Sequence, residues 1–140
     1  MISNLFSLLI ALVVVWQAPC KLRDGLYLVD SFGTCELTLH GSNETYRFGD
    51  EPIVTQKNFQ QYQRVGANTA SNYGIRIKLD HEGTEKIRDL TQSHIGERVG
   101  IIVKGRLVTA PIIEAEITDG EIMISGDLID AELRRFEKDF

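Results

Sequence analysis

The stretch Gly74-Ile75-Arg76-Ile77-Lys78-Leu79-Asp80 decides the fold, because apolar and polar residues alternate along it. A period of two places its three apolar side chains on one face of a half-buried strand. Asp80 then stands where a helix N-cap is favoured, and the spacing of Ile87 and Leu90 predicts a helix from about 82 to about 94. The stretch therefore predicts a strand followed directly by a helix.

Downstream of this helix the pattern predicts a hairpin, another strand and a last helix. Gly96 stands where a helix favours a C-terminal residue with positive φ. The hairpin, its turn, the strand and the helix are expected at Val99 to Val103, Lys104-Gly105-Arg106, Leu107 to Ala110, Glu121 to Ser125 and about Leu128 to Phe136. This order predicts an α+β fold, specifically a ferredoxin-like sandwich with a mainly antiparallel sheet and helices packed on one face.

Upstream of Gly74 the sequence predicts short strands and turns, followed by a helix and a loop. Strands are expected at 26–29, 35–39 and 44–48, a short helix at 58–64, and a polar loop at 66–74. The pattern itself shows no domain boundary.

An ordered set of short segments in the second half of the chain resembles a known family. They are Ile75-Arg76-Ile77-Lys78-Leu79-Asp80-His81-Glu82-Gly83, Leu90-Thr91, Ile95-Gly96-Glu97-Arg98, Gly100 to Pro111 and Ile124-Ser125-Gly126, with Asp50 to Thr55 upstream. In order and spacing they are similar to the head of the first large periplasmic domain of SecD/SecDF protein-export subunits. The resemblance covers about Glu51 to Phe136, and the ordered set is more specific than any one segment. It implies a leader or anchor at 1–20, a short β extension at 21–50 and a main domain at 51–140.

The resemblance implies a binding module rather than a motor. SecD-type subunits carry six membrane-spanning helices whose charged residues use the proton gradient. Beyond residue 20, no apolar run here approaches the roughly 18 to 20 residues that a bilayer span needs. The resemblance therefore implies a non-enzymatic bacterial domain that assists protein translocation or holds polypeptide at the outer face of the membrane. Its expected partners are a polypeptide or protein, including translocon components, and it needs no cofactor.

Residues 1–20 contain no charge and have a continuous apolar core, Leu8 to Trp16. An apolar core of this length fits a secretory signal better than a bilayer span. We therefore expect export to the periplasm or to the outer face of the inner membrane. Three alternatives stay open: a signal cleaved after Cys20, an N-terminal anchor or lipoprotein that tethers the chain to the membrane, and a buried helix of a cytosolic protein.

The fate of the two cysteines depends on that choice. If Cys20 is retained, it is expected either to pair with Cys35 in an oxidising compartment or to carry a lipid. Gln17 and Pro19 fit a lipobox poorly. If cleavage follows Cys20, Cys35 is left as a half-buried strand residue, with no basic neighbour to activate it.

The charge balance argues against a nucleic-acid partner. The chain carries 15 Lys and Arg against 20 Asp and Glu, for a net charge of -5. A protein that binds the phosphate backbone needs a basic stripe, and here the basic residues are scattered among more numerous carboxylates.

Two hypotheses of different classes remain for a functional site. The first is strand addition of an extended chain at the sheet edge near Thr109-Ala110-Pro111. Pro111 also suits a simpler role, in which it protects that edge from aggregation. The second is a small envelope ligand-binding protein or hydrolase that gathers four scattered side chains in a pocket. These are Asp80, His81, Glu114 and Glu116. No catalytic, cofactor-binding or metal-binding motif supports the second hypothesis.

Overall fold

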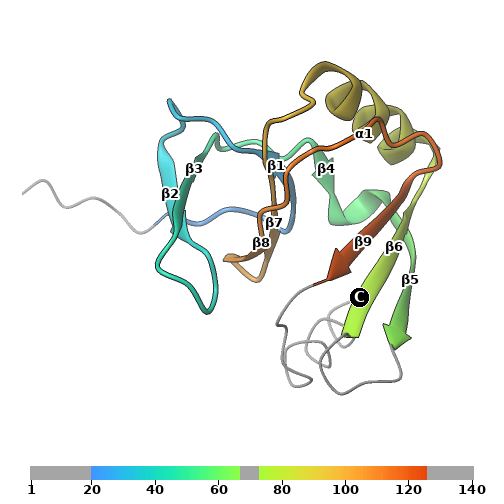
Figure 1. Cartoon of the computed structure of the whole chain (residues 1–140), viewed down its shortest axis with the longest axis horizontal. Coiled ribbons are helices and arrows are strands. Elements are labelled where there is room, and N and C mark those ends of the chain that lie inside the picture. Colours follow the sequence, from blue (N-terminus) through green and yellow to red (C-terminus); the bar gives the residue numbers. More distant parts are fainter. Residues whose placement is uncertain (1–19, 67–72, 126–140) are drawn as a thin grey trace, which may run out of the picture.

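The computed structural model describes residues 20–66 and 73–125, which form nine strands, one α-helix and one 3-10 helix (Figure 1). In chain order they are β1 Gly25–Leu28, β2 Cys35–Thr38, β3 Thr45–Phe48, β4 Val54–Thr55, η1 Gln56–Asn58, β5 Phe59–Gly66, β6 Tyr73–Leu79, α1 His81–Ser93, β7 Val99–Val103, β8 Arg106–Thr109 and β9 Glu121–Ser125. The helix expected at 128–136 and most of the loop expected at 66–74 lie outside the described residues.

A four-stranded antiparallel sheet, in the order β4-β1-β7-β8, occupies the middle of the molecule. All five residues of β7 are buried, which requires that both faces of the sheet be covered. Leu26 of β1 lies opposite Ile101 of β7 on one face, and Tyr27 lies opposite Gly100 on the other. Because side chains alternate along a strand, these two pairs belong to separate apolar clusters.

Cluster one fills the space between this sheet, α1 and a second sheet in the order β5-β6-β9. In the second sheet the alternating stretch forms β6, where Ile75 lies opposite Ile124 and Ile77 lies opposite Ile122. The buried members of cluster one are Leu26, Val54, Ile75, Ile77, Leu79, Ile87, Leu90, Val99, Ile101, Val103, Ile113, Ile122 and Ile124. The period-two stretch therefore buries the face that its sequence predicts.

Asp80 places the start of α1 against this cluster. Its Oδ1 atom accepts a hydrogen bond of 2.7 Å from the amide of Gly83, as an N-cap side chain does. The helix then presents Ile87 and Leu90 to the sheets. The helix predicted at about 82–94 is confirmed, and Gly96 after it has the expected positive φ of 89°.

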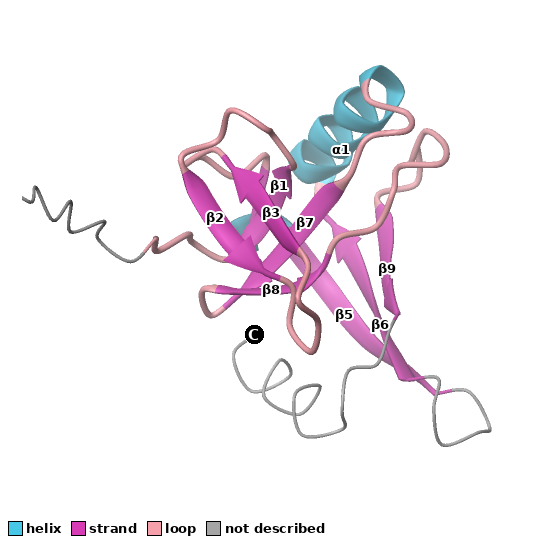
Figure 2. Cartoon of the chain, turned by 60° about the vertical axis from the view of Figure 1, so that its left-hand side comes forward, coloured by secondary structure: helices cyan, strands magenta, loops and turns pink. Residues whose placement is uncertain are grey.

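The β2–β3 hairpin covers the other face of the four-stranded sheet (Figure 2), and cluster two fills the space beneath it. Its buried members are Leu22, Tyr27, Cys35, Phe48, Ile102, Leu107 and Ala110. Phe48 is fully buried and lies over Gly100, where a Cβ atom would come within 2.4 Å of the phenyl ring. Glycine at this position therefore makes room for the aromatic side chain of the covering hairpin.

The predicted α+β class is observed, with antiparallel pairing between all named strands. The ferredoxin-like sandwich is not confirmed, since the described strands form three sheets rather than one. The helix predicted at 58–64 is wrong, because this segment forms β5 and pairs with β6 along its length. The boundary near residue 50 stays a prediction; β1, which precedes it, hydrogen-bonds with both β4 and β7.

Candidate functional site

The predicted edge at Thr109-Ala110-Pro111 already uses much of its backbone within the fold. The Ala110 carbonyl accepts a hydrogen bond of 2.7 Å from the Arg98 guanidinium, and the Pro111 carbonyl accepts one of 3.1 Å from the Val99 amide. Ala110 is buried, Thr109 is half-buried and Pro111 is exposed. Further back along β8, the Leu107 carbonyl accepts from the His40 amide. The edge is thus largely paired, and its exposed part is short.

An open groove of about 630 Å³ lies beside the end of β1, and we refer to it as the β1 groove. It is lined by residues 27–32, by Gly49, Glu51 and Ile53 from the chain before β4, and by Glu97 and Arg98 before β7. Leu28, Val29 and Ile53 supply apolar lining. Asp30 and Glu97 add carboxylates, while Glu51 is ion-paired with Arg23 at 2.7 Å and Arg98 is cationic. The groove therefore combines an apolar lining with acidic side chains.

The chain from Phe48 to β4 lines the groove and contacts β1 at two places, by a bridge at Val29 and by the pairing with β4. β4 pairs with β1 only at Gly25 and Leu26, and Pro52 before it has no amide hydrogen to extend the ladder. The Val29 amide donates to the Arg98 carbonyl, so Val29 faces β7. Backbone groups alternate in direction along an antiparallel pair, and the backbone of Leu28 therefore faces the groove side.

Phe32 stands at the mouth of the groove with 93% of its surface exposed. The turn that carries it is fixed by Asp30, whose Oδ1 atom accepts from the Phe32 amide at 2.9 Å and whose carbonyl accepts from the Gly33 amide at 2.8 Å. A side-chain bond of this kind is typical of an Asx turn, which holds the backbone without help from the aromatic ring. The ring is thus presented to solvent on a well-defined turn.

Arg98 connects the β1 groove to the predicted edge. Its side chain donates to the Ala110 carbonyl and lies 5.7 Å from the centre of the Tyr46 ring, while its carbonyl accepts from Val29. The Tyr46 hydroxyl donates to Glu44 at 2.7 Å, and this hydrogen bond, with a contribution from burial, raises the pKa of Tyr46 while Arg98 opposes the rise. The two surfaces therefore share one fixed cationic side chain.

The four residues of the hydrolase hypothesis do not converge. Asp80 caps the N-terminus of α1, and the exposed His81 begins the helix. Glu114 and Glu116 are exposed and lie near its other end, where the Ile117 amide donates to Thr91. Thirteen helical residues separate the two ends by roughly 20 Å. Within residues 20–66 and 73–125, no three His, Cys, Asp or Glu side chains are placed to hold a metal ion.

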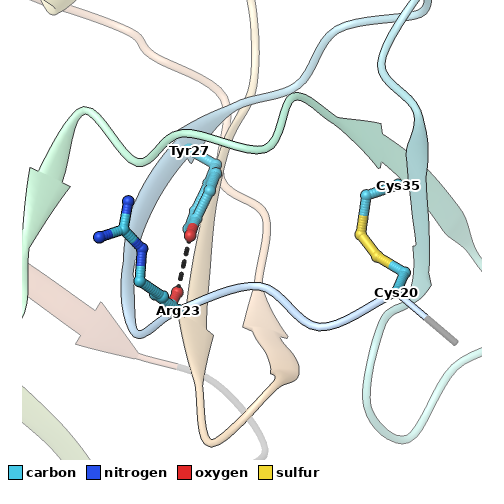
Figure 3. Close-up of a disulfide and its surroundings, with 4 residues drawn as sticks. All are labelled: Cys20, Arg23, Tyr27 and Cys35. Carbon is cyan, nitrogen blue, oxygen red and sulfur yellow. Dashed lines mark hydrogen bonds between the residues drawn. A yellow bond between two sulfur atoms is a disulfide. The ribbon is translucent and has the colours of Figure 1, made fainter.

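Cys20 and Cys35 are joined by a disulfide in the structure, with their Cα atoms 5.5 Å apart (Figure 3). Cys35 begins β2 and is buried, and Cys20 packs against cluster two. On the same stretch of chain, the Tyr27 hydroxyl donates to the Arg23 carbonyl at 2.8 Å. Burial, partly offset by Arg23, raises the pKa of Tyr27.

The sequence of this chain is similar to that of a known family. The family described as "SecDF, P1 head subdomain" matches residues 34–135. The chain belongs to this family. Among curated relatives, the protein translocase subunit SecD of Treponema pallidum is 37% identical over 102 residues, which are 73% of this chain and 16% of that protein. The protein translocase subunit SecDF of Thermus thermophilus is 42% identical over 52 residues, which are 37% of this chain and 7% of that protein.

Solved structures of SecDF share the fold of this P1 head. One, described as a structure of a membrane component SecDF that enhances protein export, matches with a TM-score of 0.60 at 18% identity, over 81% of this chain and 60% of that one. Another, SecDF in its super-membrane-facing form, matches with a TM-score of 0.58 at 20% identity, over 73% of this chain and 16% of that one. This chain spans less than a fifth of the length of the curated relatives above. Within the part of the chain that the structure describes, no helix is long and apolar enough to cross a membrane.

The sequence predicts a partner surface at the edge residues, which stays a prediction, and does not point to the β1 groove. The sequence predicts a turn between the strands at 26–29 and 35–39, and a turn is observed there. One residue, Phe32, could have indicated a binding surface here, because a large aromatic side chain on a short polar turn cannot reach the core. The contribution of Arg98 was not predictable, because its contacts come from β3 and from the chain after β8.

Proposed function

We propose that this P1 head is a non-enzymatic module that contacts a polypeptide in transit, or a protein of the export machinery, at the outer face of the bacterial inner membrane. Membership of the SecDF P1 head family is the observation that carries the proposal. The matched relatives are named protein translocase subunits. The acidic β1 groove with its exposed Phe32 supports the proposal physically, since it offers an open surface next to a rigid sheet.

The chemistry of the β1 groove suggests which segments it takes. Leu28, Ile53 and the exposed Phe32 line the groove and offer apolar contact. Asp30 and Glu97 carry carboxylates that favour a positively charged ligand, whereas Glu51 is already ion-paired with Arg23 at 2.7 Å. We therefore propose an extended polypeptide segment with apolar and basic side chains as the ligand. The exposed part of Thr109-Ala110-Pro111 extends this surface on the other side of Arg98.

Site-specific photocrosslinking in cells tests the proposal. A photoreactive phenylalanine analogue at position 32, or a photoreactive residue at Thr109, is expected to capture an exported polypeptide or a translocon subunit during export. The same probe at Gln92, exposed on α1, is the matched control. Equal capture at positions 32 and 92 would contradict the proposal. So would a failure of positions 32 and 109 to capture either an exported polypeptide or a translocon subunit.

A binding measurement with purified protein tests the ligand chemistry separately. Fluorescence anisotropy with two unfolded peptides of equal length, one apolar and basic and one apolar and acidic, should show at least tenfold tighter binding of the basic peptide. The difference should shrink in Glu97→Gln, and with added salt, because exposed charges are screened. Equal affinity for both peptides would rule out the acidic groove as the source of preference.

A further inference from the structure

Residues 20–24 pack against the folded domain and are part of it. Leu22 is buried in cluster two, and Cys20 packs against the same cluster. The Arg23 carbonyl accepts from Tyr27, and an Asp24 Oδ1 atom accepts from the Lys104 amide at 2.6 Å in the β7–β8 turn. The segment is thus fixed by side-chain burial and by hydrogen bonds to residues near and far in sequence.

The disulfide of Cys20 links this segment to the β2–β3 hairpin. Its partner Cys35 is the first residue of β2, is only 5% exposed, and lies opposite Phe48 of β3. The Cα separation of 5.5 Å is within the usual range for a disulfide. Figure 3 shows the two cysteines reaching toward each other from the chain before β1 and from β2.

We propose that Cys20 is retained in the exported protein, where its sulfur atom is committed to Cys35 and carries no lipid. A lipid thioether and a disulfide use the same Sγ atom, so the two modifications exclude each other. Cleavage after Cys20 would remove one partner of the bond and leave Leu22 close to a new, charged N-terminus. Any processing of the leader therefore occurs before Cys20.

The bond forms by oxidation of two thiols. Each cysteine gives up one proton and one electron, and the disulfide form of an envelope dithiol oxidoreductase takes up the two electrons and two protons and becomes a dithiol. An oxidising compartment is required, since cytosolic thiols are kept reduced. Once formed, the bond is protected on one side, because an attacking thiolate has little access to the buried sulfur of Cys35.

Intact-mass measurement of the full chain, expressed with its own leader and recovered from the cell envelope, tests the inference. The cysteines should not react with iodoacetamide under native or denaturing conditions before reduction, and both should react after reduction. Peptide mapping should link Cys20 to Cys35, and the mapped N-terminus should be at or before Cys20. A chain that starts at Lys21, carries an acyl group on Cys20 or has two free thiols overturns the proposal.

Two matched variants separate a disulfide from a lipid. If the sulfur atoms are bonded to each other, Cys20→Ser and Cys35→Ser should raise protease sensitivity equally and leave membrane association unchanged relative to the parent. If Cys20 carries a lipid, only Cys20→Ser should release the protein from membranes, and a clickable fatty acid should label Cys35→Ser but not Cys20→Ser. The second pattern would overturn the inference even where one variant folds poorly.

Discussion

The two faces of the four-stranded sheet are covered by different means. Cluster one buries thirteen aliphatic residues beneath a 13-residue helix and a second sheet. Cluster two buries seven residues beneath a hairpin with four-residue strands, and its largest members are the aromatic residues Tyr27 and Phe48. A two-stranded hairpin is at best marginally stable alone. The comparison teaches that a small covering layer depends on a few large contacts and one covalent bond, whereas the larger layer spreads its stability over many contacts.

The largest expected effect comes from the centre of cluster two. Phe48→Ala removes a fully buried ring that packs over Gly100 and should lower the free energy of unfolding by about 3–5 kcal/mol. Urea denaturation followed by circular dichroism measures it. Phe32→Ala is the matched control, because the Phe32 ring is 93% exposed and should change stability by less than about 0.5 kcal/mol. Similar losses in both variants would mean that the hairpin does not depend on buried aromatic contact.

Loss of the Cys20–Cys35 bond should have the next largest effect. The sequence separation is 15 residues, and the chain-entropy model gives a loss of about 3 kcal/mol for a loop of this size. Thermal unfolding with and without reductant measures the loss. The double variant Cys20→Ala/Cys35→Ala should resemble the reduced parent and should itself be insensitive to reductant. A parent that is equally stable in both conditions would show that the hairpin holds without the bond.

A small deletion in cluster one should cost less, because neighbouring side chains share the contact. Ile87→Val removes one methylene from a side chain that is 1% exposed on α1, and should destabilise by about 0.5–1.5 kcal/mol. Ile95→Val, at a side chain that is 59% exposed, is the control and should have almost no effect. If Ile87→Val lowered the free energy of unfolding as much as Phe48→Ala does, the proposed difference between the two clusters would be wrong.

The smallest expected effect concerns the ionisation of Tyr46, which lies on the covering hairpin. The folded protein raises the pKa of Tyr46 above its ordinary value, chiefly because the hydroxyl donates to Glu44. Folding therefore favours the neutral phenol, so its contribution to stability is complete below the unfolded pKa and is lost as pH rises through the folded pKa.

Glu44→Gln should lower the pKa of Tyr46, as followed by ultraviolet difference titration of the phenol. The pKa of Tyr27 serves as the internal reference, since burial is the main cause of its rise and Glu44 makes no contribution to it. An unchanged Tyr46 titration in Glu44→Gln would exclude the hydrogen bond as the main cause.

Much of the fold between β6 and β9 follows from local sequence signals. The alternation from Gly74 predicts β6, the Asp80 cap and the apolar spacing predict α1, and the segment 121–125 is observed as β9. The hairpin turn forms where Lys104 and Gly105 both take positive φ values, of 50° and 72°. These elements are predictable because pattern, cap and turn chemistry agree over short distances.

The segment that became β5 was not predictable in the same way. Gln60-Gln61-Tyr62-Gln63 has neither a clear period of two nor one of 3.6, so its structure is decided by its long pairing with β6. The β1 groove likewise depends on the path of the chain between Phe48 and β4, for which the sequence has no local signal. Sequence therefore located the core better than the surface that we propose to be functional.

The Cys20–Cys35 bond also determines how a pulling force would enter the domain. In the oxidised chain, tension applied at the N-terminal end passes from Cys20 through sulfur directly to β2. Residues 21–34, including the centrally placed β1, are then outside the load path. After reduction the same tension would act on β1 first and peel it from β4 and β7. The disulfide thus keeps tension applied at the N-terminal end from acting on β1.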